Sequence, residues 1–499
     1  MSAPDAIDKP DPGLTIGTAA ALGLMGSLAN VGFSVLRSKV MALKLGPEGL
    51  GKIAEINQLV TLANVATVTM TGAVLINHLA QARAAGDDQE VRRVVSGAWT
   101  GAIVVSGLAG ILAVILGRVV LPSPWGPSAW PLVTLAAIGA MFGASCNVPN
   151  QALIVFTRLD KATSLSIVAT LIQTALIIGA VIRFGLYGFF VATALGALLL
   201  VPMWLRTAAR YVPALKERLA WHLDRRYIRD AVRFGGATLV ASVFGQFLFT
   251  LIRWLLERQG GPQLNGQYQA ATTVGTQYLA TVLAGLGSFA FPRYAAARTP
   301  RELEVEVEAT CAFVLRLAPP IILGGIAFRD VAVHLLYSLK FANAADLLGW
   351  LMVGDLAKVV SWAIAGPLLV RGRLRAFMLC EGAGVVFHLM ASFLLIPRFG
   401  LVGEGYAQMI SYVVYMFLAL VVVVRSCELR LSYRWVLVVL PLTGVAIVAL
   451  LSTQRWPAAR WVIATLAVGW GWRSGLLGDI LNGIRTRFRK LQAALRRRG

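Results

Sequence analysis

The sequence predicts an all-α polytopic membrane protein: two parallel six-helix repeats form two lobes around a central cavity, and two extra C-terminal helices follow them. Three observations support this prediction. Hydrophobic residues make up 57% of the chain and charged residues only 14%, whereas a soluble domain carries about 25% charged residues. Apolar runs of about 18 or more residues recur, long enough to cross a bilayer as helices. The third observation is an internal repeat.

The repeat is anchored by a short motif that occurs once in each half. Residues 183–188 read RFGLYG and return as RFGLVG at residues 398–403, an offset of 215 residues. In the same frame, Gly46, Pro47 and Gly51 return as Gly261, Pro262 and Gly266, Arg83 returns as Arg298, and Arg158 returns as Arg373. Arg and Pro seldom match by chance in so apolar a chain. Internal repeats in membrane chains are typical of transporters, whose substrate site lies between the two halves.

About 14 membrane helices are expected from the apolar runs. Their predicted ranges are 14–45, 51–80, 94–121, 130–157, 162–183, 186–206, 229–257, 263–292, 309–336, 344–371, 376–397, 401–425, 434–452 and 460–480. The corresponding organisation is a cytoplasmic tail at 1–13, an N-lobe at 14–206, a linker at 207–228, a C-lobe at 229–425, two further helices at 426–480 and a basic tail at 481–499. Each repeat has an even number of helices, so both enter the membrane from the same side.

The net charge of +22 predicts an orientation in the membrane rather than a nucleic-acid partner. With both termini in the cytoplasm, most of the 46 Lys and Arg residues fall on the cytoplasmic side, as the positive-inside rule requires. In the linker, basic residues such as Arg210 and Arg225 stand beside apolar ones such as Leu215 and Trp221. This pattern predicts an amphipathic helix on anionic membrane lipid.

Three cations within predicted helices form the first candidate site. Arg37 and Lys39 lie toward the outer end of the first helix, and Arg253 of the seventh helix corresponds to Ser38 in the repeat. A charge at the centre of a membrane helix costs about 2.5–3.5 kcal/mol. Two interpretations are open: a wet central cavity in which the cations bind an anionic head group, or long side chains that carry the charge to the outer interface.

Polar residues at helical spacing form the second candidate site. Asn57, Thr61 and Asn64 share one face of the second predicted helix. Thr272 and Thr276 hold the positions of Asn57 and Thr61 in the second half. Amides and hydroxyls suit sugar hydroxyls, because they offer donors and acceptors without a buried charge. The alternative is hydrogen bonding between helices, worth about 1 kcal/mol or less per bond.

Charges that break the repeat are candidates for ion coupling. Asp355 and Lys358 stand three residues apart in the tenth predicted helix, where the first half has Ala140 and Gly143. They could couple transport to protons or sodium, or could simply pair on one helix face. Glu55 is the main carboxylate on the helices expected to line the cavity.

Motifs of enzymes, metal sites and cofactor sites are missing from the sequence. It contains no P-loop, no HExxH and no GxSxG. Glu302, Glu304, Glu306 and Glu308 alternate along one segment and are interpreted as a solvated surface face. The four cysteines form no CxxC pair and are expected to be free thiols. No catalytic residue, metal ligand or cofactor is therefore predicted.

Residues 45–51, LGPEGLG, follow a long first helix with basic residues just before the turn. This segment resembles the polysaccharide-transporter branch of the multidrug/oligosaccharidyl-lipid/polysaccharide (MOP) exporter superfamily, which includes the O-antigen and exopolysaccharide flippases. The resemblance extends over helices 1–12, the RFGLxG turn in both halves and the two extra helices. It implies a V-shaped fold with a cavity that alternates between membrane faces. In such proteins cations on helices 1 and 7 meet a lipid pyrophosphate, which points here to Arg37, Lys39 and Arg253.

The resemblance implies a flippase of the bacterial inner membrane for an undecaprenyl-pyrophosphate-linked oligosaccharide, with a polysaccharide polymerase or chain-length regulator as a further partner. The alternative is a cation-coupled multidrug exporter of the same superfamily, which usually carries an acidic residue in helix 1; none is found here. A membrane enzyme such as a polymerase or ligase would need a large outer loop with catalytic residues. The longest outer loop, 122–131, is short and holds no charged residue.

Overall fold

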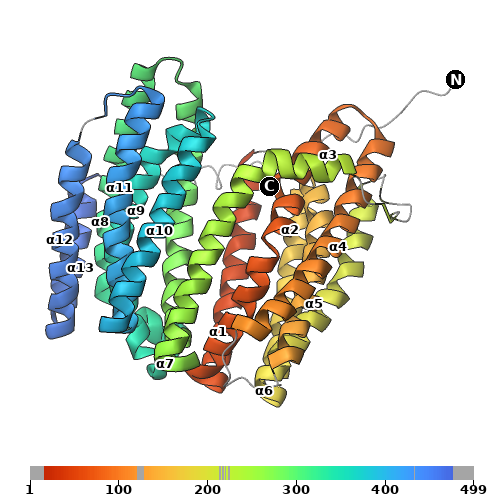
Figure 1. The fold of residues 1–499 in the computed structure, drawn as a ribbon, viewed down its shortest axis with the longest axis horizontal. Helices are drawn as coiled ribbons and strands as arrows, with labels where there is room; N and C mark the ends of the chain where they lie inside the picture. Colours follow the sequence, from red (N-terminus) through yellow and green to blue (C-terminus); the bar gives the residue numbers. More distant parts are fainter. Residues whose placement is uncertain are drawn as a thin grey trace, which may run out of the picture. The chain divides into compact units, whose positions relative to one another are not determined.

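Helices are the building elements of the computed structural model (Figure 1). It describes residues 16–120, 129–212, 225–431 and 433–475, together with residues 215, 219, 221 and 222 of the linker. No strand occurs in these ranges, and the predicted all-α class is confirmed. The predicted tails at 1–13 and 481–499 and most of the linker lie outside the described residues.

The chain divides into two compact units. The first ends at Trp254 and also includes Gly261–Gly266, and the second contains Leu255–Gly260 and the chain from Gln267 onward. The first unit holds α1 (Ile16–Ala63), α2 (Val65–Thr69), the π-helix η1 (Met70–Val74), α3 (Leu75–Ala84), α4 (Asp88–Val120), α5 (Ala129–Val155), α6 (Leu159–Tyr211) and the start of α7 (Arg225–Ala296). The second holds the rest of α7, α8 (Pro300–Leu336), η4 (Leu339–Phe341), α9 (Ala342–Val370), α10 (Leu374–Phe399), α11 (Leu401–Cys427), α12 (Arg434–Arg455) and α13 (Ala459–Arg473). The division falls inside α7, whereas the predicted C-lobe begins at residue 229.

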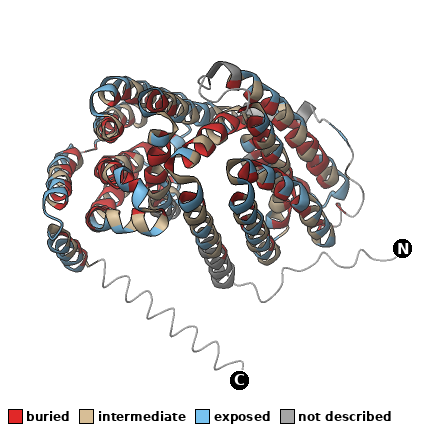
Figure 2. Cartoon of the chain, turned by 90° about the horizontal axis from the view of Figure 1, so that it is seen from below, coloured by how far each residue is buried: buried red, intermediate tan, exposed pale blue. Residues whose placement is uncertain are grey.

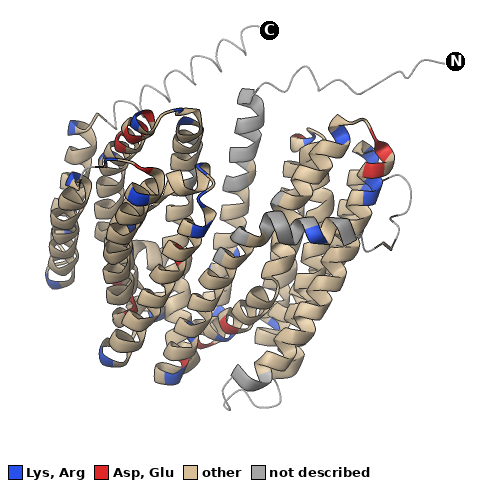
Figure 3. Cartoon of the chain, turned by 45° about the horizontal axis from the view of Figure 1, so that its top comes forward, with Lys and Arg blue, Asp and Glu red and all other residues tan. Residues whose placement is uncertain are grey.

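Long apolar helices give the chain its membrane-spanning character. Within the described ranges, nine helices are long and apolar enough to cross a membrane, or ten if the bent pair Ala29–Ala63 and Val65–Ala84 counts as one span. With 53 residues, α6 would extend about 80 Å as one helix, far more than the roughly 30 Å of hydrocarbon. Glycines with positive φ interrupt α6 at Gly185 and α7 at Gly261, between spans that the sequence predicts as separate. Charged residues gather mainly near helix ends (Figure 3).

The repeated RFGLxG motif forms the turn of a helical hairpin in each unit. Gly185 in α6 has a φ of 57°, and Gly400 between α10 and α11 has a φ of 60°. A β-carbon at Gly188 or Gly403 would lie 2.1 or 2.3 Å from a carbonyl oxygen of the preceding helix. Only glycine adopts the left-handed turn without strain and permits so close an approach. This explains why both glycines of the motif recur.

The repeated GPxxxG segments contact each other inside the first unit. A β-carbon at Gly51 would lie 1.8 Å from the carbonyl oxygen of Pro262, and one at Gly266 would lie 1.8 Å from the carbonyl oxygen of Pro47. The two contacts are reciprocal at the offset of 215 residues. Each glycine therefore makes room for the backbone of the other segment.

An interruption follows α1. Asn64 separates α1 from α2, and the chain bends by 63° between Ala29–Ala63 and Val65–Ala84. Gly72 within η1 has non-helical backbone angles (φ −96°, ψ −120°). The Tyr227 hydroxyl, at the start of α7, donates to the carbonyl oxygen of Met70 at 2.5 Å in a buried position. A side chain beyond the linker thus satisfies the backbone where the π-helix begins.

The alternating glutamates of α8 are only partly solvated, so the interpretation as a solvated surface face is wrong in part. Glu302 completes a capping box at the start of the helix. Glu304 accepts a hydrogen bond from the backbone N–H of Arg430 at 2.5 Å, and Glu308 forms an ion pair with Arg434. These carboxylates attach the chain at the start of α12 to α8.

A buried cation also joins α12 to α8 and α9 within the second unit. Arg329 of α8 is 2% exposed and donates from Nη1 to Oγ1 of Thr453 in α12 at 2.6 Å. Asp346 of α9 lies 3.8 Å from Nη2 of the same arginine.

Buried faces point toward neighbouring helices and exposed faces away from them, as expected of helices surrounded by lipid (Figure 2).

Candidate functional site

A cavity of about 470 Å³ lies inside the first unit and is the candidate binding site. Such a volume lies within the range of roughly 300–1,000 Å³ found for small-molecule sites. Its polar lining consists of Thr61, Asn64, Thr67, Thr71, Asn147 and Asn150, and Trp204 of α6 completes the wall. None of the lining residues is charged. The cavity therefore suits a neutral polar ligand better than an anion.

The interrupted helix supplies one wall of this cavity. Thr61 and Asn64 lie before or at the break, and Thr67 and Thr71 lie beyond it. The opposite wall comes from α5, where Pro149 has no N–H to donate within the helix. Irregular backbone at membrane depth is tolerated where it lines a cavity or is buried in protein. The break thus places polar side chains at depth in the unit.

Hydrogen bonding leaves acceptors in the cavity wall. The Thr61 hydroxyl donates to the carbonyl oxygen of Asn57 at 2.7 Å, so its oxygen still has acceptor capacity. Asn147 Nδ2 donates to Thr71 Oγ1 at 3.2 Å and joins α5 to the π-helix. Asn64 donates from Nδ2 to the backbone, but its buried Oδ1 has no hydrogen-bond partner among the described residues.

The predicted polar stripe divides between two places. Thr61 and Asn64 line the cavity, whereas Asn57 does not. Thr272 and Thr276 belong to the second unit, where both hydroxyls donate to backbone carbonyls one turn earlier in α7. Thr61 and Asn64 make the same kind of bond within their own helix, so the two halves differ only in that the first stripe lines this cavity and the second does not.

The predicted cations have different surroundings, and none of them lines the cavity. Arg37 is half-buried, and its guanidinium makes no ion pair or hydrogen bond with a described residue. Lys39 is half-buried and engaged by a neighbouring group. Arg253 is 6% exposed and donates from Nη1 to Oδ1 of Asn265 at 2.9 Å. Glu55, a predicted ion-coupling residue, is buried in the same unit.

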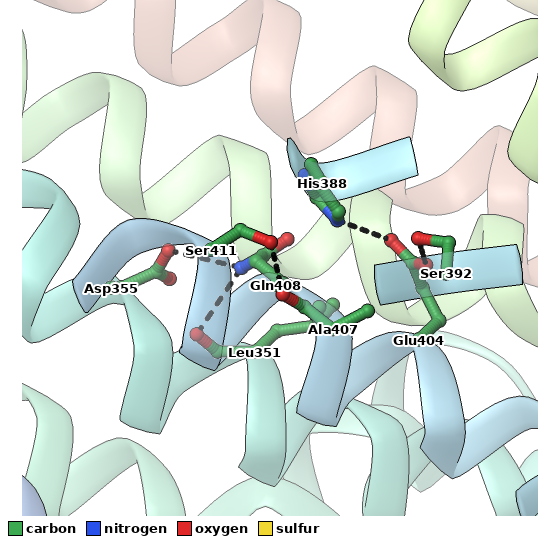
Figure 4. A network of polar contacts seen from close by, with 8 residues as sticks. All are labelled: Leu351, Asp355, His388, Ser392, Glu404, Ala407, Gln408 and Ser411. Carbon is green, nitrogen blue, oxygen red and sulfur yellow. Dashed lines mark hydrogen bonds and ion pairs between the residues drawn. The ribbon is translucent and has the colours of Figure 1, made fainter. Parts of the chain in front are cut away.

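Asp355, another predicted ion-coupling residue, lies in a buried polar network of the second unit (Figure 4). The Tyr278 hydroxyl donates to its Oδ2, and Gln408 donates to its Oδ1 at 3.5 Å. The Lys358 ammonium lies 4.8 Å from the centre of the Tyr412 ring, and no ion pair joins it to Asp355. The two residues are close enough to interact electrostatically, but their charged groups are not in direct contact.

Thr67, Asn147, Asn150 and Trp204 line the cavity but were not identified from the sequence. Asn147 and Asn150 stand three residues apart on either side of Pro149, in a largely apolar helix, and that pattern is a usable signal. Trp204 carries no such signal, because the sequence places tryptophans in many helices. Its position in the wall depends on how α6 packs against α5.

Comparisons with known proteins agree with this fold. Residues 40–346 match the family model described as polysaccharide biosynthesis protein. The lipid III flippases of Escherichia coli (strain K12) and Shigella flexneri are each 26% identical over 425 residues, which cover 81% of this chain and 96% of theirs.

Two solved structures share the fold. The lipid II flippase MurJ in an inward closed conformation superposes with a TM-score of 0.66 at 10% identity. The alignment covers 94% of this chain and 100% of the MurJ chain. An inward-facing multidrug resistance MATE family transporter of the MOP superfamily has a TM-score of 0.60 at 15% identity, over 79% of this chain and 94% of its own. At these identities the likeness concerns the fold alone. With more than half of its length matched by the family model, the chain belongs to the polysaccharide biosynthesis protein family, as its resemblance to polysaccharide transporters predicts.

Proposed function

We propose that the chain is a flippase that moves a lipid-linked oligosaccharide, anchored by undecaprenyl pyrophosphate, across the bacterial inner membrane for O-antigen, capsule or exopolysaccharide synthesis. The observation that carries this proposal is the family match over residues 40–346. Identity of 26% with lipid III flippases, over 96% of their length, supports it. The mechanism is alternating access of a cavity between the two membrane faces.

The chemistry of the substrate divides into an anion and a neutral glycan. We assign the pyrophosphate to the cations Arg37, Lys39 and Arg253, because positive charge in a low-dielectric site attracts it and lowers the cost of crossing. Arg37 supports this assignment best, since it is half-buried and no described residue pairs with it. The polar side chains Thr61 and Asn64 supply hydrogen bonds without charge.

The setting follows from the distribution of charge. We place both termini in the cytoplasm, with the basic linker and tail against anionic lipid, by the positive-inside rule. A polysaccharide polymerase or chain-length regulator would act next on the translocated unit at the outer face.

A deletion strain tests the proposal. Its lipid-linked saccharides would be extracted and weighed by mass spectrometry, and its surface polysaccharide would be measured. Intact lipid-linked units that accumulate inside while surface polymer disappears would support the flippase. Unchanged polymer with increased drug sensitivity would instead identify a multidrug exporter.

The assignment of Arg37 has its own test in the complemented deletion strain. Arg37→Ala should lower surface polysaccharide at least tenfold, while membrane protein levels stay normal. Arg375→Ala is the matched control, because this exposed arginine of α10 has no assigned role and should leave the polymer unchanged. Normal polymer in the Arg37 variant would remove this residue from the site.

A further inference from the structure

We propose that the cavity of the first unit binds one neutral sugar ring of the lipid-linked glycan, through Thr61, Asn64, Asn150 and the indole of Trp204. This inference rests on the proposed function and deepens it, because it assigns glycan recognition to a defined site inside one unit. It also separates recognition of the sugar from recognition of the pyrophosphate.

The charge of the wall decides the class of ligand. The polar groups in the lining are hydroxyls, amides, an indole N–H and the Cys146 thiol, and no lining residue is ordinarily charged. A pyrophosphate in this cavity would lose its hydration without gaining a cation, which is strongly unfavourable in a low-dielectric interior. A neutral hexose or N-acetylhexosamine avoids this cost and matches each wall group with a hydroxyl or an amide.

Unused hydrogen-bonding capacity favours a ligand rich in hydroxyls. The buried Oδ1 of Asn64 accepts no hydrogen bond from a described residue. The Asn150 side chain lines the cavity and likewise makes no hydrogen bond with a described residue. Buried polar atoms are nearly always paired in folded proteins, so the Oδ1 of Asn64 calls for a partner, while the half-buried Asn150 amide is open to a ligand. A sugar hydroxyl can donate to one and accept from the other.

Trp204 completes the site with an aromatic surface. It is 6% exposed and lines the same cavity as the amides. A pyranose ring has an apolar face of C–H groups and a polar edge of hydroxyls. An indole beside two amides can contact the face while the amides bind the edge.

The wall is also held in a fixed geometry. Asn147 donates to Thr71 Oγ1 at 3.2 Å, and Ser106 donates to Thr67 Oγ1 at 3.2 Å, so both threonines beyond the break are anchored by neighbouring helices. We assign Asn147 a positioning role, since it joins α5 to the π-helix. A rigid wall loses little conformational entropy when a ligand binds.

Binding measurements on the purified full chain in nanodiscs test the proposal. The probes are citronellyl pyrophosphate and the same lipid carrying a single glucose, galactose or N-acetylglucosamine, and calorimetry gives each Kd. The wild type should bind at least one glycosylated probe about tenfold more tightly than the bare pyrophosphate. The variant Thr61→Val/Asn150→Leu should lose that preference and bind the bare probe unchanged, because two hydrogen bonds are worth roughly tenfold to thirtyfold in affinity.

Thr134→Val is the matched control. Thr134 is exposed on α5, and its hydroxyl donates to a carbonyl one turn earlier, as that of Thr61 does. This control should keep the wild-type preference. If the double variant does not fold, Thr61→Val alone replaces it in the binding measurement, because valine preserves the shape of the threonine side chain.

The outcomes separate this inference from the proposed function. Equal affinity of the wild type for all four probes would overturn the sugar site and leave the flippase standing. A glycosyl preference that survives in the variants would also overturn it. Failure of the wild type to bind any pyrophosphate probe would contradict the proposed function itself.

Discussion

Gly51 and Gly266 tolerate no side chain. A β-carbon added to either glycine would lie 1.8 Å from the carbonyl oxygen of a proline. That oxygen belongs to the backbone and cannot rotate away as a side chain could. Gly51→Ala and Gly266→Ala should each destabilise the protein by about 1–3 kcal/mol or more, as overpacking does. The apparent Tm of the detergent-purified variants, followed by size-exclusion chromatography after heating, measures the effect.

Two other glycines serve as controls for these substitutions. At Gly32 on α1 and Gly245 on α7, an added β-carbon would meet no atom within 4 Å, so alanine there should be neutral or slightly stabilising. If Gly51→Ala kept the wild-type Tm, the contact between residues 46–51 and 261–266 would contribute nothing to stability, and the prediction would be wrong.

Asp355 offers a second residue-level prediction, which tests ion coupling. Asp355→Asn keeps an oxygen for the Tyr278 hydroxyl but removes the charge, so the fold should persist within about 1–2 kcal/mol. We expect surface polysaccharide to fall at least tenfold in a strain that carries this variant. Full polymer with a normal Tm would assign Asp355 to packing alone.

Sequence spacing identified part of the cavity. Thr61 and Asn64 were predicted because their positions share a helix face, and that periodicity is local. Trp204 and the pairing of Arg253 with Asn265 depend on tertiary contacts that no local pattern encodes. Asn57 satisfies the same spacing yet stays outside the cavity, because the wall begins one turn later.

Among the elements, the α10–α11 hairpin depends on a buried carboxylate. Glu404, 1% exposed, accepts from Ser392 Oγ at 2.7 Å and lies 3.1 Å from His388 Nε2 (Figure 4). His388→Leu would leave the carboxylate with one donor fewer and should cost about 1–3 kcal/mol of unfolding free energy. Denaturation of purified variants in a mild detergent measures this change.

A double-mutant cycle distinguishes this hydrogen bond from packing. Replacement of both partners, as in His388→Leu/Glu404→Met, should recover part of the lost stability, because no unpaired carboxylate remains. His222→Leu is the control, because the side chain of His222 is exposed and only its backbone N–H makes a hydrogen bond, to Thr100. Strictly additive effects in the cycle would contradict the coupling.

The helices themselves were largely predictable, but their joints were not. About 14 spans were predicted, whereas the described residues form nine or ten candidate spans, because α6 and α7 each join two predicted spans and α13 has only 15 residues. Glycines at 185, 261 and 400 separate spans that the structure joins closely. A single left-handed residue can end one helix and start the next, so no polar loop marks the turn in the sequence. The π-helix at Met70–Val74 likewise has no composition that distinguishes it from α-helix.

For the whole molecule, the charge distribution predicts which side each terminus faces. The four cysteines are free and buried or half-buried, so a cysteine-less background replacing Cys146, Cys311, Cys380 and Cys427 by alanine is practicable. In that background, Ser2→Cys and Gly499→Cys should resist a membrane-impermeant maleimide in intact cells and react after permeabilisation. Ser128→Cys, in the predicted outer loop, should react in intact cells. Labelling of either terminus in intact cells would reverse the proposed orientation.

The reciprocal glycine contact also has a consequence for how the protein is made. The segment with Gly51 leaves the ribosome well before the segment with Gly266, which lies 215 residues further along the chain. At about 5–20 residues per second, this interval lasts roughly 10–40 s. During that time the first segment resides in the bilayer without its counterpart, and this close backbone contact of the first unit forms only when the second copy arrives. Assembly of the first unit is therefore completed by a stretch of chain that belongs, by sequence, to the second half.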